Sequence, residues 1–367
     1  MKRSFFVTLG LIISRYSAFG AVPRDSEEFS IALKRAEEIA DGFARHPANN
    51  HPFFKTLEEE VDKGLTPQQF EFIWKNYGYR TAGTFISVMN QAIHEAKKGN
   101  FEFLPYVMTN AGEEGGSIDK EGNIIPAHMG ACQDAFNTLG KTIYGQDPIE
   151  VAKIDESEVL PEVLEFRRKQ EAASKAPGEI ITGRFLGHEN AASGMLRAFE
   201  KIFIAQKGNF NEEQYNIMVQ YFRFHIPESE TEFGIEDRHG KDAILVTAAA
   251  LYKNLNTVVE EQILEGGKEM LDAQETLWNA MKLRLEELGR DKDHERIPPK
   301  KGPFLNSKDD IEIGKRRSGM EVFNDGSSEK FSPNSVPTSK ERTFLPEVKT
   351  LSGNPVIPSK ESQSLGK

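Results

Sequence analysis

Residues 29–43, FSIALKRAEEIADGF, decide the fold class of this chain. Their apolar side chains recur at spacings of three and four residues, which gathers them on one face of an α-helix. The same spacing returns in residues 70–77 and 85–93, and the sequence has no alternating run rich in Val, Ile and Thr. We therefore expect an all-α fold in which helices bury their apolar faces against one another as a bundle.

The predicted helices are separated by stretches rich in glycine, proline and asparagine, which favour turns and loops. These stretches are residues 46–52, 63–67, 112–126 and 207–209. In the second of them, Thr66 followed by Pro67 is typical of a helix N-cap and the first helical residue. A helix is therefore expected to begin directly after Thr66.

Composition divides the chain into three parts. Residues 1–24 combine a basic start, an apolar run over 5–13 and small residues near 18–20, as a signal peptide does. Residues 25–289 carry the helical periodicity and form the predicted bundle. Residues 290–367 hold 8 of the 18 prolines and no periodicity, so we expect a disordered tail. The first part predicts an exported protein or, if it is only a flexible lead, a cytoplasmic one.

Charge and cysteine content restrict the function. The chain has 46 Lys and Arg against 57 Asp and Glu, a net charge of -11, which disfavours binding to nucleic acid. No stretch is long and apolar enough to predict a membrane span. The single cysteine, Cys132, can form neither an intrachain disulfide nor a thiolate-based metal cluster. A metal site in this chain must therefore use histidine and carboxylate ligands.

The densest group of polar residues is 225–242, HIPESETEFGIEDRHGKD. In a helix that starts near Pro227, Glu232, Glu236 and His239 lie at i, i+4 and i+7 and share one face. Glu236 and His239 also have the Glu-x-x-His spacing found in two-metal sites of helical bundles. The same short pattern occurs on solvated faces of acidic helices, so it needs support from other segments.

Two further segments offer ligands of the same type. Residues 191–200 are mostly small and apolar and end on Glu200, whose burial is costly unless it is paired or bound to metal. Glu113 and Glu114 lie in a glycine-rich stretch, and His128 follows after a loop. The alternative is that Glu200 is a surface acid and that His128 is an ordinary core histidine.

In their order along the chain, four stretches resemble the heme oxygenase-like diiron oxidases and oxygenases. This family shares a superfamily with thiaminase II-type and pyrroloquinoline-quinone-synthase-type proteins. The stretches are residues 51–57 with 64–79, residues 112–128, residues 193–200 and residues 225–239. The resemblance covers roughly residues 27–289 and implies a single heme oxygenase-like helical bundle.

The resemblance also implies a set of iron ligands on separate helices. The set consists of Glu113 or Glu114, His128, Glu200, His225 or Glu232, Glu236 and His239. In this arrangement Glu200 bridges two iron ions. One of the adjacent glutamates joins His128 at one ion, and the spacing in the family favours Glu113 over Glu114. His225, Glu236 and His239 hold the other ion.

The last ligand segment departs from the pattern of the family, which is His, three residues, Asp, two residues, His. Glu236 stands where the family has Asp, and Glu232 stands where it has the first His. His225 lies seven residues further back, so it remains the ligand only if the intervening residues are an insertion. We favour His225, with Glu232 as the alternative.

The function implied by the resemblance is that of a non-heme diiron enzyme. Such a protein uses two iron ions, with manganese as an alternative metal, and O₂ to oxidise a small organic substrate. Asp237 and Asp242 are candidates to orient the imidazole rings. His94, His188 and His294 receive no role in this site. A homodimer is also compatible with the resemblance, and the tail is a candidate contact for a protein partner.

Three other functions remain open at this point. A thiaminase II-like, metal-free hydrolase needs a nucleophilic cysteine, for which Cys132 is the candidate. A heme oxygenase-type enzyme needs a proximal histidine near the N-terminus, for which His46, His51 and His94 are available. A secreted partner-binding protein would use the bundle as a scaffold and the tail as its interaction element.

Overall fold

The computed structural model describes residues 22–118, 122, 124–190, 192–226, 235–291, 294–300 and 302, and all structural statements below concern these residues. Helices dominate the described chain, which confirms the predicted all-α fold class. Strands β1 (Ser117–Ile118) and β2 (Ile124–Ile125) form a short antiparallel pair in which Ser117 lies opposite Ile125. This pair lies within the stretch predicted as a loop.

The helices follow one another with short connections. In chain order they are α2 (Glu27–Ala44), α3 (Pro52–Lys63), α4 (Pro67–Thr81), α5 (Thr84–Lys98), α6 (Leu104–Gly115), α7 (His128–Tyr144), α8 (Pro161–Glu171), α9 (Ile180–Glu189), α10 (Ala192–Ala205), α11 (Glu212–His225), α12 (Ile235–Leu251) and α13 (Val258–Arg290). Short 3₁₀ helices are η1 (Pro47–Asn50), η2 (Val151–Lys153), η3 (Glu156–Glu158), η4 (Ala172–Lys175) and η5 (Lys207–Asn209).

The turn before α4 forms as its sequence predicts. Gly64 ends α3 with a positive φ of 88°, a conformation that side-chain-bearing residues rarely adopt. Thr66 caps α4 by accepting the backbone N–H of Gln69, while the Gln69 side chain accepts the backbone N–H of Thr66. Pro67 then occupies the first turn, where its missing N–H costs nothing.

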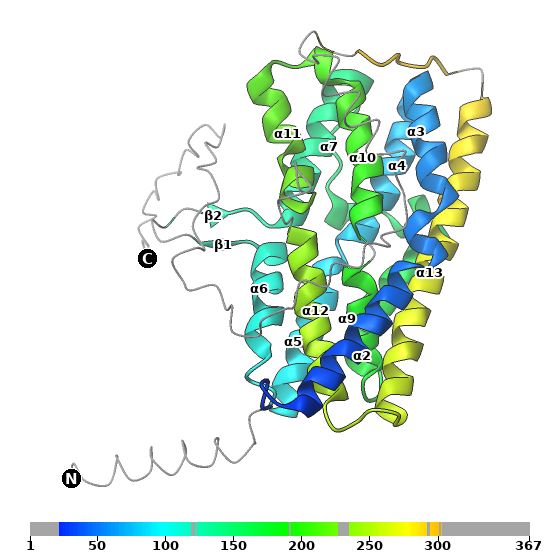
Figure 1. Cartoon of the computed structure of the whole chain (residues 1–367). Coiled ribbons are helices and arrows are strands. Elements are labelled where there is room, and N and C mark those ends of the chain that lie inside the picture. Colours follow the sequence, from blue (N-terminus) through cyan, green and yellow to red (C-terminus); the bar gives the residue numbers. More distant parts are fainter. Residues whose placement is uncertain are drawn as a thin grey trace, which may run out of the picture. The chain divides into compact units, whose positions relative to one another are not determined.

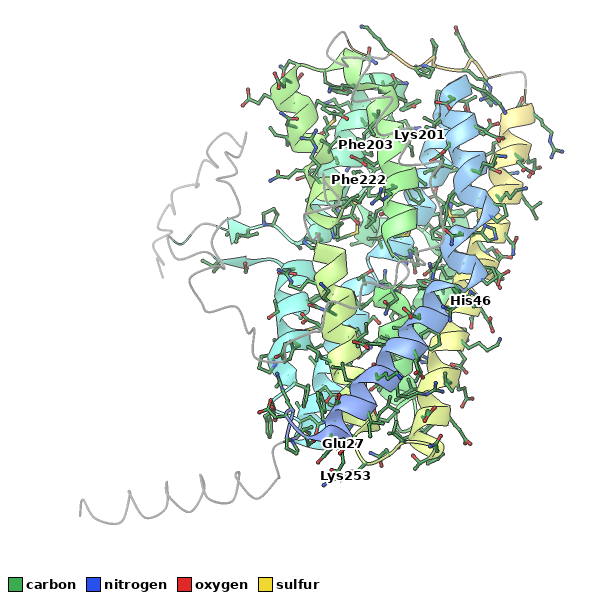
Figure 2. All side chains as sticks on the ribbon, in the orientation of Figure 1. Glu27, His46, Lys201, Phe203, Phe222 and Lys253 are labelled. Atoms are coloured by element: carbon green, nitrogen blue, oxygen red, sulfur yellow. The ribbon has the colours of Figure 1, made fainter. Side chains whose placement is uncertain are left out.

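Two histidines fasten the corner between α2 and α3 to the long helix α13. In both His46 and His51, the ring Nδ1 accepts the backbone N–H two residues further on, which leaves Nε2 as the donor. Nε2 of His46 donates to Asp272 over 3.2 Å, and Nε2 of His51 donates to Asn279 over 3.1 Å. Figure 2 labels His46 at this corner, next to α13. Both rings therefore have structural roles.

The helices form two tiers that meet end to end (Figure 1). The upper tier in that view contains α3, α4, α7, α10 and α11, and the lower tier contains α2, α5, α6, α9 and α12. Helix α13 runs past both tiers and packs against α3, α4 and α9. The chain therefore passes from one tier to the other between α4 and α5, and again between α9 and α10. Both passages lie where the two tiers meet.

Each tier has its own apolar core. In the upper tier, Phe203 of α10 and Phe222 of α11 face each other with ring centroids 5.1 Å apart (Figure 2). In the lower tier, the apolar stripe of residues 29–43 is buried along α2, which packs on α12. Burial of one large apolar side chain contributes about 1.5–3 kcal/mol, so these cores hold each tier together.

Helices α9 and α13 touch through glycines. A Cβ atom added to Gly183 would lie 2.0 Å from the backbone oxygen of Ile263. Reciprocally, a Cβ atom added to Gly266 would lie 2.1 Å from the backbone oxygen of Ile180. Only glycine allows the two backbones to approach this closely. The contact fixes the position of α9, which ends at Glu189.

Residues beyond the predicted bundle boundary at residue 289 also contact the bundle. The backbone N–H of Ile297 donates to the oxygen of Leu65 over 3.0 Å, and Arg296 binds Glu60 over 2.7 Å. Residues 294–300 are therefore held against the bundle, because their backbone and side chains find partners on it. The rest of the predicted tail from residue 303, and residues 1–21 of the predicted signal segment, lie outside the described residues.

Within the described ranges, none of the helices combines the length and the apolar character that a membrane crossing needs.

Candidate metal centre

Histidines and carboxylates meet where the two tiers join. Each of them lies at or near the end of a helix: Glu113 and Glu114 at the end of α6, His128 at the start of α7, His188 and Glu189 at the end of α9, His225 at the end of α11, and His239 in the first turns of α12. The site therefore forms from helix ends that meet where the two tiers join, and not along the face of one helix.

The first group consists of Glu114, His128 and His225. The Nδ1 atom of His128 lies 3.4 Å from Oε1 of Glu114 and 3.1 Å from Nε2 of His225. One ligand atom from each residue lies within 4.8 Å of the others. Nδ1 of His225 lies 2.5 Å from the backbone oxygen of Tyr221 and donates to it. That bond leaves the Nε2 lone pair of a neutral His225 directed at the group.

The electrostatics of this group favour an ionised carboxylate on Glu114 and a neutral imidazole on His225. Burial acts to raise the pKa of Glu114, but the hydrogen bond from His128 and the charge of His128 hold that pKa at about 2. Burial, reinforced by the charge of His128, lowers the pKa of His225 to about 3. Glu114 is therefore ionised and His225 neutral at pH 7, the forms in which both bind metal.

The second group is centred on His239, whose side chain is only 1% exposed. Its Nε2 lies 2.7 Å from Oε2 of Glu113, and its Nδ1 lies 3.4 Å from Oε2 of Glu189. Arg238 also binds Glu113. Oε1 of Glu189 is buried without a hydrogen-bond partner in the described chain. A buried carboxylate oxygen in this condition is costly, and a bound cation would satisfy it.

Two buried titratable residues surround these groups. Burial raises the pKa of Asp242 to about 6, although Arg238 and His239 oppose the shift. Burial lowers the pKa of His188 to about 3, and the positive charge of Arg80 acts in the same direction. The Nδ1 atom of His188 has no hydrogen-bond partner among the described residues.

A small cavity of about 20 Å³, room for about one water molecule, lies beside the two groups. It is lined by Arg80, Thr81, Thr84, Glu114, His188, Glu189, Met195, Leu196, Tyr221 and His225. Its wall thus combines carboxylates, imidazoles and a guanidinium with the apolar side chains of α10.

The structure brings together five of the candidate ligands named from the sequence. These are Glu113, Glu114, His128, His225 and His239. Both glutamates take part, each in a different group, and it is Glu114, not the favoured Glu113, that lies beside His128. His225 lies with Glu114 and His128 instead of sharing a group with His239. The expectation that His225 and His239 share one ion is therefore not supported by this geometry.

Glu200 is not in either group, in contrast to the predicted bridging role. It lies on α10 one turn beyond Leu196, which lines the pocket, and its side chain is partly exposed. Burial raises the pKa of Tyr215 to about 12, and the nearby charge of Glu200 contributes to this shift. Glu200 therefore lies beside the first half of α11, whereas the site is at the end of that helix.

The remaining candidates cannot be placed in the site. Glu232 lies in residues 227–234, outside the described residues, and the side chains of Glu236 and Asp237 are also outside them. Helix α11 ends at His225 and α12 begins at Ile235, so His225 and His239 belong to separate helices.

Sequence reasoning missed His188 and Glu189, which the structure places in the site. His188 received no role from the sequence, yet it is only 5% exposed and lies beside the two groups. A signal was available, because the two residues end a helix whose other residues are mostly apolar or glycine. Adjacent ionisable residues at the end of a buried helix require partners or a ligand.

Comparison of this chain with protein-family models and with the sequences of curated proteins finds no match.

Proposed function

We propose that this protein is a non-heme enzyme that holds two iron ions and uses O₂ to oxidise a small organic substrate. The observation that carries the proposal is the convergence of Glu114, His128 and His225 from three helices, with donor atoms within 4.8 Å of one another. Three converging donors of this type, two of them buried, are unusual unless they share a cation or a hydrogen-bond network.

The residues present fit such metal ions. Imidazole nitrogen and carboxylate oxygen suit divalent iron, with manganese as an alternative, and the neighbouring group at His239 offers the same two ligand types. The Oε1 atom of Glu189, which has no hydrogen-bond partner among the described residues, is a further potential metal ligand. When bound, a pair of redox-active ions supplies the electrons with which O₂ is reduced.

The protein's own residues fix the geometry of the site. The backbone oxygen of Tyr221 holds the ring of His225 and selects its tautomer. Arg238 orients Glu113 by a charge-assisted hydrogen bond. Asp242, only 8% exposed, is a nearby acid that can hold a proton near neutral pH because burial raises its pKa to about 6. Met195 and Leu196 exclude water from one wall of the pocket.

The residues that a hydrolase or a heme-binding enzyme would use are less well suited to those functions. Cys132 is fully buried, and burial raises the pKa of its thiol well above the usual value, which disfavours the thiolate that a hydrolase needs. In His46 and His51, Nδ1 accepts a backbone N–H and Nε2 donates to α13, so both rings already serve the corner between α2 and α3.

Metal analysis tests the proposal directly. The purified protein is loaded with Fe(II) without oxygen, desalted and assayed for iron, and we expect about two ions per chain. Each of the variants Glu114→Gln and Glu189→Gln should retain at least one ion fewer than the wild-type protein. The amide keeps the shape of the side chain but loses the anionic ligand. Glu200→Gln is the matched control and should retain both ions, because Glu200 lies outside both groups.

Two results would count against the proposal. Wild-type protein that retains no iron after loading contradicts the metal site itself. Iron loss in Glu200→Gln together with full retention in Glu189→Gln contradicts the assignment made from the structure and favours the ligand set implied by the family resemblance.

A further inference from the structure

A second and larger cavity, with a volume of about 630 Å³, lies along α11 beside η5 and residue 302. Its described lining consists of Lys207, Gly208, Phe210, Asn211, Glu212, Tyr215, Asn216, Arg223 and Gly302. None of these residues belongs to the two groups of the candidate metal centre. Small-molecule sites in proteins usually have volumes of about 300–1,000 Å³, so this cavity has room for a ligand of the size of a nucleotide.

Hydrogen-bonded backbone bounds one side of this cavity. The backbone N–H of Gly208 donates to the oxygen of Lys300 over 2.7 Å, and the N–H of Lys300 donates to the oxygen of Ala205 over 2.9 Å. A Cβ atom added to Gly208 would lie 2.6 Å from the same Lys300 oxygen, so the close contact requires glycine. Residues 298–300 are thereby held beside η5, and the side of the cavity that they adjoin is fixed.

Two cationic side chains of the cavity meet at the ring of Tyr215. The Nζ atom of Lys207 lies 4.9 Å from the centre of this ring, and the guanidinium carbon of Arg223 lies 5.8 Å from it. Both distances are within the range of a cation–π contact. Arg223 also donates through Nη1 to the side-chain oxygen of Asn216 over 3.0 Å. Because Tyr215 is only 4% exposed, its ring is a fixed support for both positive charges.

The lining of the cavity carries a net positive charge. Lys207 forms no ion pair with a carboxylate of the described chain. Glu212 is the one carboxylate of the described lining, against the two cations Lys207 and Arg223, and Glu200 lies near Tyr215 without lining the cavity. This local excess contrasts with the net charge of -11 on the whole chain. A concave surface with an excess of one charge attracts ligands of the opposite charge.

Phe210 provides the cavity with an aromatic surface. Its half-buried ring packs against the upper core and also lines the cavity. A phosphate accepts charge-assisted hydrogen bonds from lysine and arginine. A planar heterocyclic ring stacks on an aromatic side chain. Cations and an aromatic ring in one cavity are therefore suited to a phosphate group joined to a planar ring.

We propose that this cavity binds a nucleoside monophosphate, whose phosphate pairs with Lys207 and Arg223 and whose base lies against Phe210. The site is separate from the candidate metal centre, and it does not depend on the proposed function. Lys207 and Arg223 are then the residues that distinguish the nucleotide from the uncharged nucleoside.

Calorimetric titration with adenosine 5′-monophosphate (AMP) tests the proposal, with adenosine as the uncharged probe that has the same base. The protein should bind adenosine at least tenfold more weakly than AMP, because adenosine lacks the phosphate that pairs with the two cations. Lys207→Gln should weaken AMP binding by about tenfold. Phe210→Leu keeps an apolar side chain but removes the flat ring, so it should weaken AMP and adenosine binding alike by about several-fold.

Lys253→Gln is the matched control for Lys207→Gln. The Nζ atom of Lys253 also lies 4.9 Å from the centre of a tyrosine ring, that of Tyr252, but Lys253 lies in the lower tier and does not line the cavity (Figure 2). Its replacement changes the net charge of the protein equally and should leave AMP affinity unchanged. An equal loss of affinity in both variants would show that AMP responds only to overall charge, which overturns the site.

If Lys207→Gln does not fold, as judged by its circular dichroism, Arg223→Gln decides. The Arg223 side chain is exposed, and its replacement should also weaken AMP binding by about tenfold.

Titration of both iron-loaded and metal-free protein separates this site from the candidate metal centre, because a phosphate can also bind iron. AMP affinity should be the same in the two samples. AMP binding that requires iron and is unchanged in Lys207→Gln places the phosphate at the metal, which overturns the cavity site and leaves the diiron proposal intact. Equal affinity for AMP and adenosine, or no binding of AMP in either sample, also overturns it. AMP binding that depends on Lys207 in protein that retains no iron supports the cavity site and counts against the diiron proposal alone.

Discussion

Replacement of Gly183 by alanine tests whether the close contact of α9 and α13 is as tight as the structure shows. The added Cβ atom would lie 2.0 Å from the backbone oxygen of Ile263. Carbon and oxygen atoms ordinarily approach to about 3.3 Å, so the two helices must separate by about 1.3 Å. The obstacle is backbone rather than the end of a flexible side chain, so a change of rotamer cannot remove it.

The expected cost follows from two opposing effects. Overpacking of a well-packed interior costs about 1–3 kcal/mol, and the rigid obstacle places Gly183→Ala near the upper limit. Alanine is favoured over glycine inside a helix by about 1 kcal/mol, which offsets part of this cost. The net destabilisation is about 2 kcal/mol, which corresponds to a fall of about 4–8 °C in Tm for a domain of this size.

Thermal unfolding followed by circular dichroism measures this effect, with Gly42→Ala as the control. A Cβ atom added to Gly42 on α2 meets nothing within 4 Å, so the control should be stabilised by about 0.5–1 kcal/mol. Unfolding of Gly183→Ala at the wild-type temperature or above it would refute the close contact. In that case α9 and α13 cannot be packed backbone against backbone at this point.

Three further predictions concern the stability of the bundle. Burial acts to raise the pKa of Glu179, but its hydrogen bond to a histidine and the charge of a lysine, both on α5, lower it from 4.5 to about 2. The ionised Glu179 therefore stabilises the fold fully above pH 4.5, and this stabilisation is lost as the pH falls towards 2. Urea unfolding of Glu179→Gln should accordingly show a deficit at pH 6 that shrinks at pH 3, and a deficit independent of pH would refute the assignment. His51→Ala should destabilise the protein by about 1–2 kcal/mol in the same assay at pH 7, because it removes both the cap of α3 and the bond to Asn279. Arg296→Ala should cost about 1–3 kcal/mol by leaving the buried Glu60 without its guanidinium partner, and an unchanged urea midpoint would show that residues 294–300 are not held against the bundle.

The fold class could be predicted because helical periodicity is a local property of the sequence. The stripe within residues 29–43 needs only the spacing of its apolar residues, and the N-cap at Thr66 needs only its immediate neighbours. The two-tier arrangement could not be derived in this way. It depends on contacts between distant segments, such as Gly183 with Ile263, whose partners no local pattern identifies.

The candidate site was predictable only in part, for the same physical reason. The residue types were recognised from their chemistry, and His128 and His225 do lie together. Glu200 was chosen because it ends an apolar stripe of residues 191–200. In the structure, however, Glu200 lies near Tyr215 of α11 and outside both groups. Glu189 was overlooked because its role arises from where α9 ends relative to other helices, which spacing along the chain does not encode.

Consecutive residues of α6 serve the two groups, Glu114 with His128 and Glu113 with His239. Their Cα atoms are separated by a single trans peptide, about 3.8 Å. The covalent chain thereby limits how far the α6 ends of the two groups can move apart. Any one-residue insertion or deletion in the preceding turn of α6 would rotate the pair by about 100° and detach both groups at once.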